Sequence, residues 1–580
     1  MSSSSSPDLR QSAACHFLEG LHEVGIEYLF SNLGTDHVAL IEAMALFTRQ
    51  GRPQPKVLLC PHENVAIHMA AGYAAVTGRG QGVMVHVDAG TANAAMGMHN
   101  LFRSRLPVLL MAGRAPFTLR GELPGSRDTY VHFVQDPFDI ASLVRPYVKW
   151  EYSLPSGVVA KEVLRRAHSV MQSDPPGPVY LTLPRETLAE EWDAAQVASF
   201  PAQRYGAVAA GGIPADEARN IAKALMRAKS PIAVTAYLGR KPEAVAALEA
   251  LALACGIRVF EFMPTAMNIS RRSPCFGGFD PARGLAGADL GLLLDVDVPW
   301  IPKFTRPDGA TRFVHIDVDP LKRDFPMWGF ATDVRLQADC ATALAQVLQA
   351  VQAEADDDFR QRVAERMASW PQQQGERMKA VAAAAAHPGT AGALSAAFVC
   401  AAIGAAIDPE DIVVNEGIRN SPVVLSQIMR TLPGTLTGGA GGGLGYSGGM
   451  ALGARLANPK VRAIQIVGDG GFHFSTPTSV YAVAQRYKLP IFTVVLDNGG
   501  WQAVKEAVLR VYPQGEAAGA NEFQARLGGE QRRFDMVAQA FGAHGEYVTE
   551  PDQLPGAITR CLAALDAGRA AVLHVKVAGL

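Results

Sequence analysis

Two clusters of polar and glycine residues near the carboxyl end of the chain carry groups suited to binding a metal ion and an anion. Gly468-Asp469-Gly470 ends the apolar run RAIQIV, and Asp497-Asn498-Gly499-Gly500 ends the run PIFTVVL. Both runs are typical of buried parallel strands, and open α/β sheets bind ligands at the carboxyl ends of such strands. The Asp469 carboxylate, the Asn498 amide oxygen and the Gly500 carbonyl are hard oxygen donors of the kind that Mg²⁺ or Ca²⁺ prefers. The two clusters therefore predict a site for a diphosphate held by a metal ion.

The glycines of these clusters have a role of their own in this prediction. Without a side chain, glycine lets backbone N–H groups approach an anion closely. We therefore expect Gly470 and Gly471 to donate to the diphosphate. The alternative interpretation is an ordinary glycine turn followed by an unrelated asparagine.

The elements that must position these groups fall into three blocks of alternating strand-like and helical runs. This alternation predicts an α/β protein with three doubly wound parallel-sheet domains, at residues 8–190, 205–350 and 390–580. A linker rich in Ala, Pro and Gly, from Trp192 to Pro214, separates the first two blocks. A polar stretch of helical character follows Val351 and connects the second block to the third. The expected strands of the first two blocks lie near residues 28–30, 57–59, 82–86, 108–112, 179–183, 232–235, 258–260, 290–294 and 312–316.

Bulk properties of the 580 residues exclude several classes of protein. A net charge of -2 and a pI near 6.7 provide no electrostatic basis for binding nucleic acid or an anionic membrane. The seven cysteines form no CxxC pair, which is typical of a reducing compartment and argues against a zinc site or a disulfide framework. We expect a cytoplasmic protein whose start, MSSSSSPDLR, is a frayed tail and not a signal peptide. The uncharged segment 391–407 is mostly Ala and Gly, and it predicts a helix packed on a sheet in preference to a membrane span.

A second candidate for chemistry is the carboxylate of Glu63. It stands just after a strand-like run in PHENVA, followed by MAAGYA, and it begins an apolar helix. An isolated acid at this place is favoured by the helix dipole alone, so one interpretation gives Glu63 a purely structural role.

Together these stretches resemble the thiamine diphosphate enzymes. Gly-Asp-Gly with a later Asn is similar to the family's diphosphate signature, and PHENVA with MAAGYA is similar to the HEx(n)AxGYA stretch of acetolactate synthase, pyruvate oxidase and benzoylformate decarboxylase. The resemblance covers most of the chain. It implies pyrimidine-binding, middle and diphosphate-binding domains in that order, with thiamine diphosphate and Mg²⁺ as cofactors.

For Glu63, the resemblance implies a hydrogen bond to N1' of the cofactor's aminopyrimidine. Protonation at N1' favours the imino tautomer, whose neighbouring nitrogen removes the C2 proton of the thiazolium. In this family the glutamate usually comes from the other subunit. The resemblance therefore implies a homodimer or a homotetramer with active sites between subunits.

The resemblance also assigns backbone groups around the cofactor. The stretch from Thr437 to Ala454 is similar to the family's glycine-rich bed, in which the Gly442 carbonyl accepts from the 4'-amino group and Leu444 props the pyrimidine against the thiazolium. A flexible glycine loop is the alternative for this stretch. Asn415-Glu416-Gly417 resembles the Asn-Glu-Ser stretch of benzoylformate decarboxylase, and Gly417 and Ile418 are expected to donate N–H groups to the diphosphate.

Several polar and aromatic residues are candidates for the substrate pocket. His86 stands four residues before Gly90-Thr91, where benzoylformate decarboxylase has a proton-relaying histidine; a structural strand-end histidine is the alternative. Thr35 matches a small hydroxyl that binds a substrate carboxylate in relatives, and a helix N-cap explains it equally well. The other candidates are Asp136, near the place of a Phe-Gln-Glu stretch in acetolactate synthases, and Trp501, Gln502 and Glu506 after the metal loop. Core packing is the alternative for Trp501, and Arg419 is either a source of charge at the site or a surface residue.

Departures from the family pattern limit what can be said of the substrate. The region 295–303 contains no histidine, although benzoylformate decarboxylase uses one from its middle domain, and the Tyr-Glu-Glu pattern of oxalyl-CoA decarboxylases is missing. The stretch from Gly468 to Asn498 is longer than is usual, and we expect the excess in a loop from Phe472 to Thr478. No GxGxxG follows the strand-like PIAVTAYLGR, so FAD or ADP in the middle domain is possible but unsupported.

The predicted activity is cleavage or formation of a C–C bond beside a carbonyl. A 2-oxo-acid decarboxylase or an acyloin-type carboligase is the first hypothesis, and a 2-hydroxyacyl-CoA lyase is the second. A catalytically silent cofactor-binding scaffold is the hypothesis of another class. Glu63 separates it from the enzymes, because an inactive protein has no need of the activating carboxylate together with Asp469 and Asn498.

Overall fold

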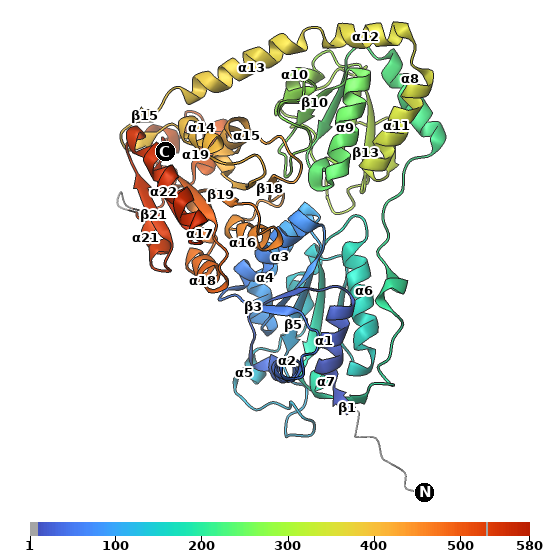
Figure 1. The fold of residues 1–580 in the computed structure, drawn as a ribbon, viewed down its shortest axis with the longest axis vertical. Helices are drawn as coiled ribbons and strands as arrows, with labels where there is room; N and C mark the ends of the chain where they lie inside the picture. Colours follow the sequence, from blue (N-terminus) through green and yellow to red (C-terminus); the bar gives the residue numbers. More distant parts are fainter. Residues whose placement is uncertain (1–9, 529–531, 580) are drawn as a thin grey trace.

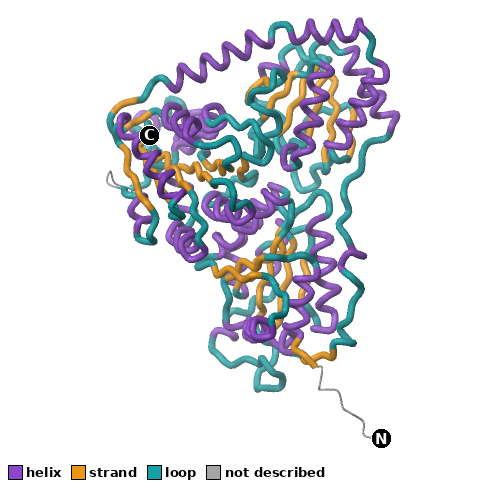
Figure 2. Tube along the Cα trace, viewed as in Figure 1, coloured by secondary structure: helices purple, strands orange, loops and turns teal. Residues whose placement is uncertain are grey.

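The computed structural model describes residues 10–528 and 532–579, so all of the predicted N-terminal tail except Arg10 lies outside the described residues. The chain forms three α/β units, each built on a six-stranded parallel sheet (Figure 1). Helices pack on the faces of the sheets, as the tube drawing in Figure 2 shows. The predicted fold class, three doubly wound parallel sheets, is confirmed.

The first unit has the strand order β3-β2-β4-β5-β7-β6. Its central strands are almost continuously apolar because helices cover both faces of the sheet. The strands are β2 (Tyr28–Ser31), β3 (Lys56–Leu59), β4 (Gln81–Val85), β5 (Val108–Arg114), β6 (Glu151–Ser153) and β7 (Val179–Pro184). The helices are α1 (Ala13–Glu23), η1 (Thr35–His37), α2 (Val38–Gln50), α3 (Glu63–Thr77), α4 (Val87–Ser104), α5 (Val131–Val134), α6 (Ala160–Gln172) and α7 (Arg185–Ala189).

The middle unit has the order β11-β10-β9-β12-β13-β14. The predicted linker into it begins inside β8 (Glu191–Asp193), which pairs antiparallel with β1 (Arg10–Ser12). The strands are β9 (Pro231–Thr235), β10 (Arg258–Glu261), β11 (Phe276–Gly278), β12 (Leu290–Leu294), β13 (Arg312–Asp317) and β14 (Val334–Gln337). The helices are α8 (Ala215–Arg227), α9 (Pro242–Cys255), α10 (Ala282–Leu285) and α11 (Cys340–Glu354).

The third unit has the order β18-β17-β19-β20-β22-β21. Helices α12 (Asp357–Met367) and α13 (Trp370–Ala385) cross the top of Figure 1 to reach it, so the predicted helical connector is confirmed. The strands are β17 (Ile412–Glu416), β18 (Leu436–Gly438), β19 (Ala463–Gly468), β20 (Phe492–Asp497), β21 (His544–Val548) and β22 (Ala571–Lys576). A short antiparallel pair, β15 (Gly389–Thr390) and β16 (Ala393–Leu394), precedes them. The helices are α14 (Ala396–Ala406), α15 (Ser421–Gln427), α16 (Ser447–Ala457), α17 (Asp469–Phe474), α18 (Pro477–Tyr487), α19 (Gln502–Val511), α20 (Glu516–Ala520), α21 (Phe534–Gln539) and α22 (Leu554–Asp566).

One local prediction in this unit is wrong. The expected loop from Phe472 to Thr478 is mostly helical, because α17 extends to Phe474 and α18 already begins at Pro477. Thr476 turns the chain between the two helices with a left-handed φ of 51°. Proline at the first position of α18 suits this start, since its fixed φ is helical and its missing N–H is not needed there.

Helix α14 occupies most of the uncharged segment 391–407. Its N-cap is Ser395, whose hydroxyl accepts from the Phe398 N–H. Within the part of the chain that the structure describes, no helix combines the length and the apolar character needed to cross a membrane. The prediction of a helix packed on a sheet is confirmed, because Val399 and Ile403 belong to the core that α14 shares with β17 and β22.

Two helices rich in small residues, α3 and α16, join the first unit to the third. A Cβ on Gly72 would lie 2.1 Å from the carbonyl oxygen of Met450, and a Cβ on Gly453 would lie 2.0 Å from that of Met69. Only glycine permits so close a contact between the two backbones. The amino ends of the two helices also lie close together, because Asn64 at the start of α3 donates to the Gly445 carbonyl just before α16. Candidate functional residues lie there.

Candidate functional site

Glu63 is the first residue of α3, and its side chain is buried. Its Oε1 accepts from Asn32 Nδ2 at 2.8 Å, and its Oε2 accepts from Asn93 Nδ2 at 3.0 Å. A residue that served only the helix dipole would need neither partner. The two amides hold the carboxylate in one orientation, as a group that must meet a ligand atom requires.

The amino end of α3 lies against the glycine-rich turn that precedes α16 in the same chain. Asn64 Nδ2 donates to the Gly445 carbonyl at 3.1 Å and to the Phe474 carbonyl at 3.3 Å. Asn100, on α4, donates to the Gly443 carbonyl at 3.0 Å and accepts from the Gly443 N–H at 3.1 Å. These bonds order the turn, which does not support the alternative of a flexible loop. The residues assigned to the pyrimidine, Gly442 and Leu444, belong to this turn.

Glu416, at the end of β17, also binds this glycine-rich turn. Its carboxylate accepts from the N–H of Gly445, from the N–H of Ser447 at 2.9 Å and from the Ser447 hydroxyl at 2.5 Å. Burial raises the pKa of Glu416 to about 7, although these bonds oppose the shift. Sequence reasoning assigned no role to Glu416, which here fixes the start of α16.

The two residues expected to contact the diphosphate after β17 lie on a turn of their own. The Gly417 N–H donates to Asn415 Oδ1 at 3.0 Å, so it is already used within the turn. Ile418 is exposed. Arg419, whose role the sequence left open, forms an ion pair with Glu506 on α19. Gly417 and Ile418 both line a cavity next to the middle unit.

The candidate metal ligands lie at the carboxyl ends of β19 and β20, as predicted. Asp469 begins α17 and is 1 % exposed, and Asn498 Oδ1 accepts from the Gly500 N–H at 3.2 Å. Among the described residues, no group of three or more His, Cys, Asp or Glu side chains is arranged to hold a metal ion. A divalent ion here would therefore depend on amide and carbonyl oxygens and on oxygens of a bound ligand. That mixture of hard oxygen donors suits Mg²⁺, so the residues present fit the predicted ion.

A guanidinium group lies among these carboxylates. Arg532 donates from Nη1 to Asp469 Oδ2 at 3.1 Å and from Nη2 to Asp497 Oδ1 at 2.5 Å. Asp497 also accepts from His574 Nε2 at 2.9 Å and from Lys576 Nζ at 3.0 Å. Burial opposes ionisation of Asp497, but these three donors hold its pKa below the usual range. Burial, and next the charge of Asp497, raise the pKa of Asp469 to about 6.

Trp501 covers the start of α17. A Cβ on Gly470 would lie 2.1 Å from the Trp501 ring, and the ring also packs edge-on against Phe474, with centroids 5.8 Å apart. Any side chain larger than that of glycine at position 470 would therefore clash with the Trp501 indole. Gln502 begins α19, and its buried Oε1 has no hydrogen-bond partner. The Trp501 indole and the unpartnered amide oxygen of Gln502 thus lie close to the candidate metal site.

The substrate-pocket candidates of the first unit divide into two groups. His86 lies at the end of β4, where its Nδ1 bonds Asp36 Oδ1 at 2.5 Å and its Nε2 lies 3.0 Å from Gln135 Oε1. Thr35 is the first residue of η1, whose N-cap is Gly34, so Thr35 is not the N-cap. Its hydroxyl lies 3.3 Å from His132 Nε2. The structure does not bring Asp136 into this group, because its carboxylate pairs with Arg127.

The middle unit fills the carboxyl edge of its own sheet with charged side chains. Lys322 Nζ donates to Asp317 Oδ2 at 2.6 Å and to Asp297 Oδ1 at 2.8 Å. Arg105 of the first unit donates from Nη2 to the same Asp297 Oδ1 at 2.8 Å and from Nη1 to Asp297 Oδ2 at 3.2 Å. Buried charges of this kind require partners, and here they have them.

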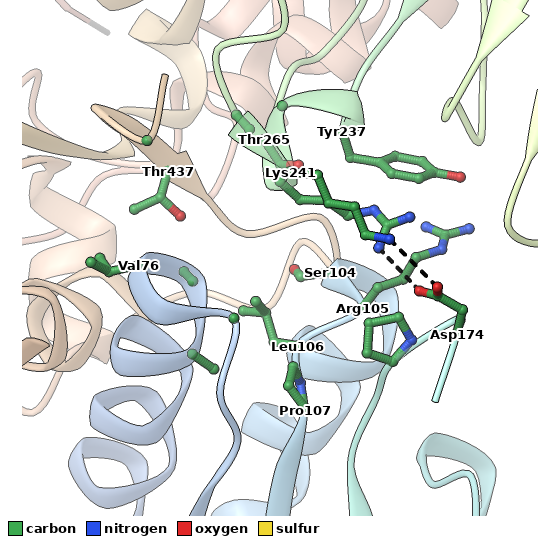
Figure 3. A pocket seen from close by; sticks show the side chains of 18 of the residues that line it. Val76, Ser104, Arg105, Leu106, Pro107, Asp174, Tyr237, Lys241, Thr265 and Thr437 are labelled. Carbon is green, nitrogen blue, oxygen red and sulfur yellow. Dashed lines mark hydrogen bonds and ion pairs between the residues drawn. The ribbon is translucent and has the colours of Figure 1, made fainter. Parts of the chain in front are cut away.

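Next to this network of buried charges, a cavity of about 280 Å³ lies between the three units and is lined by Lys241, Thr437 and others (Figure 3). The sequence provides no support for FAD or ADP in the middle domain, and the structure leaves that question untested.

A larger cavity, of about 530 Å³, lies between the middle and third units. Gly417, Ile418 and Tyr446 contribute to its floor, and Met263 and Ile301 contribute an apolar wall from the middle unit. This cavity therefore gives access to the glycine-rich turn from the side of the middle unit.

Comparison with known proteins identifies two domains in this chain. Residues 11–143 match the thiamine pyrophosphate enzyme, N-terminal TPP binding domain, and residues 419–575 match the C-terminal TPP binding domain. The first match contains Glu63 and His86, and the second contains Asp469 and Asn498. The chain belongs to the thiamine pyrophosphate enzymes.

Relatives match along nearly the whole chain. Benzoylformate decarboxylase of Pseudomonas aeruginosa is 26% identical over 94% of this chain and 96% of its own, and acetolactate synthase of Bacillus subtilis is 24% identical over 92% and 88%. Among solved structures, a thiamine diphosphate-dependent 4-hydroxybenzoylformate decarboxylase of Rhodococcus jostii has a TM-score of 0.76 at 21% identity, covering 98% of this chain and 100% of that one. Benzoylformate decarboxylase of Polynucleobacter necessarius has a TM-score of 0.77 at 18% identity, covering 98% and 99%. The solved structures share the fold, and the relatives agree with a decarboxylase or an acetolactate synthase-like enzyme.

Several residues of the site were missed by sequence reasoning. Asn32 and Asn93 lie in the stretches around Thr35 and His86 but were given no role, because 31 and 30 residues separate them from Glu63 in the sequence. Asp36 follows Thr35 directly and was likewise given no role. Arg532 lies 63 residues after Asp469 and belongs to no motif, so nothing local in the sequence pointed to it.

Proposed function

We propose that this chain is a thiamine diphosphate- and Mg²⁺-dependent enzyme that decarboxylates a 2-oxo acid or joins the resulting acyl group to a carbonyl acceptor. The observation that carries the proposal is the Glu63 carboxylate, buried, oriented by Asn32 and Asn93, and placed beside the glycine-rich turn through Asn64. The names of two groups of relatives, benzoylformate decarboxylase and acetolactate synthase, support a 2-oxo acid as the substrate class.

Each half of the proposed site has a distinct task. When bound, thiamine diphosphate supplies a nucleophilic carbon and an electron sink for cleavage of the C–C bond beside a carbonyl. Glu63 would share a proton with the aminopyrimidine at N1', and the Gly442 carbonyl would accept from the 4'-amino group. Leu444, half-buried in the turn, would set the angle between the two rings.

The diphosphate end would be held by the third unit. Asp469, Asn498 and the Gly500 carbonyl would hold Mg²⁺, and the N–H groups of Gly470 and Gly471 would face the phosphates. The amino end of α17 adds its helix dipole, which favours a negative charge. Arg532 already donates to Asp469 Oδ2, so its guanidinium would lie beside the ion and oppose its binding electrostatically.

The substrate would meet the polar groups of the first unit. His86 is the candidate for moving a proton to or from a substrate oxygen, and Thr35 is the candidate for binding the substrate carboxylate. Trp501 and Gln502 of the third unit would line the opposite side, while Glu506 contributes through its ion pair with Arg419.

Assembly into a homodimer or homotetramer, with sites between subunits, remains a prediction from the family. The described contacts of Asn64 show that one chain also brings α3 to its own glycine-rich turn. Coexpression of Glu63→Gln with Asp469→Ala distinguishes the two arrangements. Recovered activity in mixed assemblies supports sites between subunits, because one site then receives both intact residues; a pair that stays inactive supports sites within one chain.

An activity screen tests the proposal directly. Aliphatic and aromatic 2-oxo acids, with and without an aldehyde acceptor, are supplied with thiamine diphosphate and Mg²⁺, and CO₂ and acyloin products are measured. Turnover of 2-oxo acids that is lost in Glu63→Gln supports the proposal. Turnover of 2-hydroxyacyl-CoA thioesters alone would replace it with the lyase hypothesis, and cofactor binding without any turnover would favour a silent scaffold.

A further inference from the structure

Asp36 is buried beside the candidate catalytic histidine, and it belongs to no motif assigned above. It is the middle residue of η1 and is 1 % exposed. Its Oδ1 lies 2.5 Å from His86 Nδ1, and its Oδ2 accepts from the Val87 N–H at 3.3 Å. Both carboxylate oxygens are therefore directed at His86 and at the residue that follows it.

A second histidine contacts Asp36 but does not supply it with a proton. His37 Nδ1 lies 3.2 Å from Asp36 Oδ1, yet the same nitrogen accepts from the Gly34 N–H at 3.0 Å. A ring nitrogen that accepts a hydrogen bond carries no proton. The proton of the neutral His37 ring is therefore on Nε2, which is buried and has no hydrogen-bond partner. His86 Nδ1–H, and not His37, is therefore the ring donor of the hydrogen bond to Asp36 Oδ1.

The backbone around this pair is shaped to admit it. A Cβ on Gly34 would lie 2.0 Å from His86 Nδ1, and a Cβ on Gly113 would lie 1.4 Å from Asp36 Oδ2. Val87, directly after His86, has a left-handed φ of 25°, which is costly for a β-branched residue. Strain of this kind persists where the surroundings impose it, and such positions concentrate at functional sites.

The His86 ring is partly exposed, and its other nitrogen contacts a glutamine. The His86 side chain is 24 % exposed, while the Asp36 side chain is not exposed at all. His86 Nε2 lies 3.0 Å from Gln135 Oε1, on the segment that also carries His132 and the Thr35 contact. The charged and titratable groups around His86 are Asp36, His37, Asp88, His132 and, beyond His132, Arg185. Of these, Asp36 is the carboxylate hydrogen-bonded to the ring, and Asp88 uses its Oδ1 to accept from the Ala89 N–H.

We propose that Asp36 is a positioning residue that keeps a proton on His86 Nδ1, fixes the ring plane and leaves Nε2 to exchange a proton with the substrate. This inference rests on the function proposed above. In the charged ring, Nε2–H gives its proton to a substrate oxygen, and the ring becomes neutral with its remaining proton on Nδ1, bonded to Asp36. The reverse transfer restores the imidazolium without any other reactant. The hydrogen bond that His86 donates to Asp36 raises the pKa of His86, so the charged ring persists to higher pH than a free imidazole would.

The test follows the histidine itself and does not depend on turnover. The pKa of His86 is measured by NMR in protein labelled on its histidine rings, with the signal assigned by its loss in His86→Gln. In Asp36→Asn, which keeps the size of the side chain but removes its charge, the pKa of His86 is expected to fall by about one unit or more. Asp88→Asn is the matched control, because it removes a nearby charge that makes no bond to the ring; it is expected to shift the pKa by only a few tenths. An unchanged pKa in Asp36→Asn overturns the proposal.

A double-mutant cycle adds a kinetic readout. If Asp36 acts through His86, Asp36→Asn lowers kcat in the wild-type background, about tenfold or more, but has no further effect in the His86→Gln background. Equal losses in both backgrounds would assign Asp36 a merely structural role and overturn the proposal. Should Asp36→Asn unfold, Asp36→Ser is measured in the same two ways. A wild-type protein that turns over no 2-oxo acid would contradict the proposed function. The NMR measurement would still show whether Asp36 controls the pKa of His86.

Discussion

The Nη1 atom of Arg532 donates to Oδ2 of Asp469 at 3.1 Å, so a carboxylate predicted to bind a metal ion has a guanidinium partner within its own chain. The same guanidinium bonds Asp497, and its side chain is only 12 % exposed. A divalent ion at Asp469 must compete with this internal cation. Arg532 therefore links the stability of the cofactor-free chain to its affinity for the metal.

Replacing Arg532 by glutamine tests this link. We expect Arg532→Gln to destabilise the cofactor-free protein by about 3 kcal/mol, because two buried carboxylates lose a charged partner. We also expect it to strengthen Mg²⁺-dependent binding of thiamine diphosphate, measured by calorimetry, since the competing cation is gone. Arg533→Gln is the control: its neighbouring guanidinium is 44 % exposed and pairs with Asp535. An Arg532→Gln protein with wild-type metal affinity would contradict the competition.

Glu63→Gln should separate cofactor binding from cofactor activation. The amide keeps the size of the side chain but holds the proton at N1' less well, so exchange of the thiazolium C2 proton should slow about 100-fold or more. Cofactor affinity should change little. The measurement is deuterium exchange at C2 by NMR after rapid quenching. Glu243→Gln, in the first turn of α9, is a control with the same chemistry at another helix start; wild-type exchange in Glu63→Gln would remove Glu63 from the mechanism.

The pH dependence of stability should reveal the buried carboxyl of Asp469. Its folded-state pKa is raised to about 6 from an ordinary value of 3.8, so the folded state binds the proton more tightly than the unfolded state. This group therefore lowers the stability of the cofactor-free protein as the pH rises from about 4 to about 6, and the full cost remains above that range.

Asp469→Asn should accordingly remove that cost. At pH 7 we expect the variant to be more stable by about 2 kcal/mol in denaturant unfolding, with the advantage shrinking towards pH 4. The same variant should lose Mg²⁺-dependent cofactor binding, because a neutral amide replaces the charged ligand. Asp408→Asn, at a carboxyl that is 69 % exposed, is the control. A gain in stability that is equal at pH 4.5 and pH 7 would contradict the assignment of the slope to Asp469.

The contact between α3 and α16 predicts a strong effect for one methyl group. In Gly453→Ala, the added Cβ would lie 2.0 Å from the Met69 carbonyl, so the helices must separate at a cost of about 2 kcal/mol or more. Denaturant unfolding measures the loss. Gly519→Ala in α20 is the control, because no atom lies within 4 Å of its new Cβ, and better helix propensity should leave it neutral or slightly more stable. Equal stability of the two variants would show that the packing of α3 on α16 is looser than the structure has it.

The sequence alone was sufficient for the fold class and for the family. Apolar runs such as RAIQIV are buried on both faces only in a parallel sheet covered by helices, and this pattern is local and repeated. The motifs around Glu63 and Asp469 are also short stretches of sequence, because a few residues at the end of one strand are enough to bind a phosphate or a ring nitrogen. The loop expected from Phe472 to Thr478 was wrong, because α17 starts on Asp469 and continues through the residues assigned to that loop.

Only the tertiary structure decided which partners those residues have. Glu63 is held by amides 31 and 30 residues away, Asp36 meets His86 across 50 residues, and Arg532 reaches Asp469 across 63. Such pairs depend on which strand ends the sheet order brings together, and on where glycines leave room for a side chain. Neither is encoded in a local pattern, because a buried charge is satisfied by geometry and not by its neighbours in sequence.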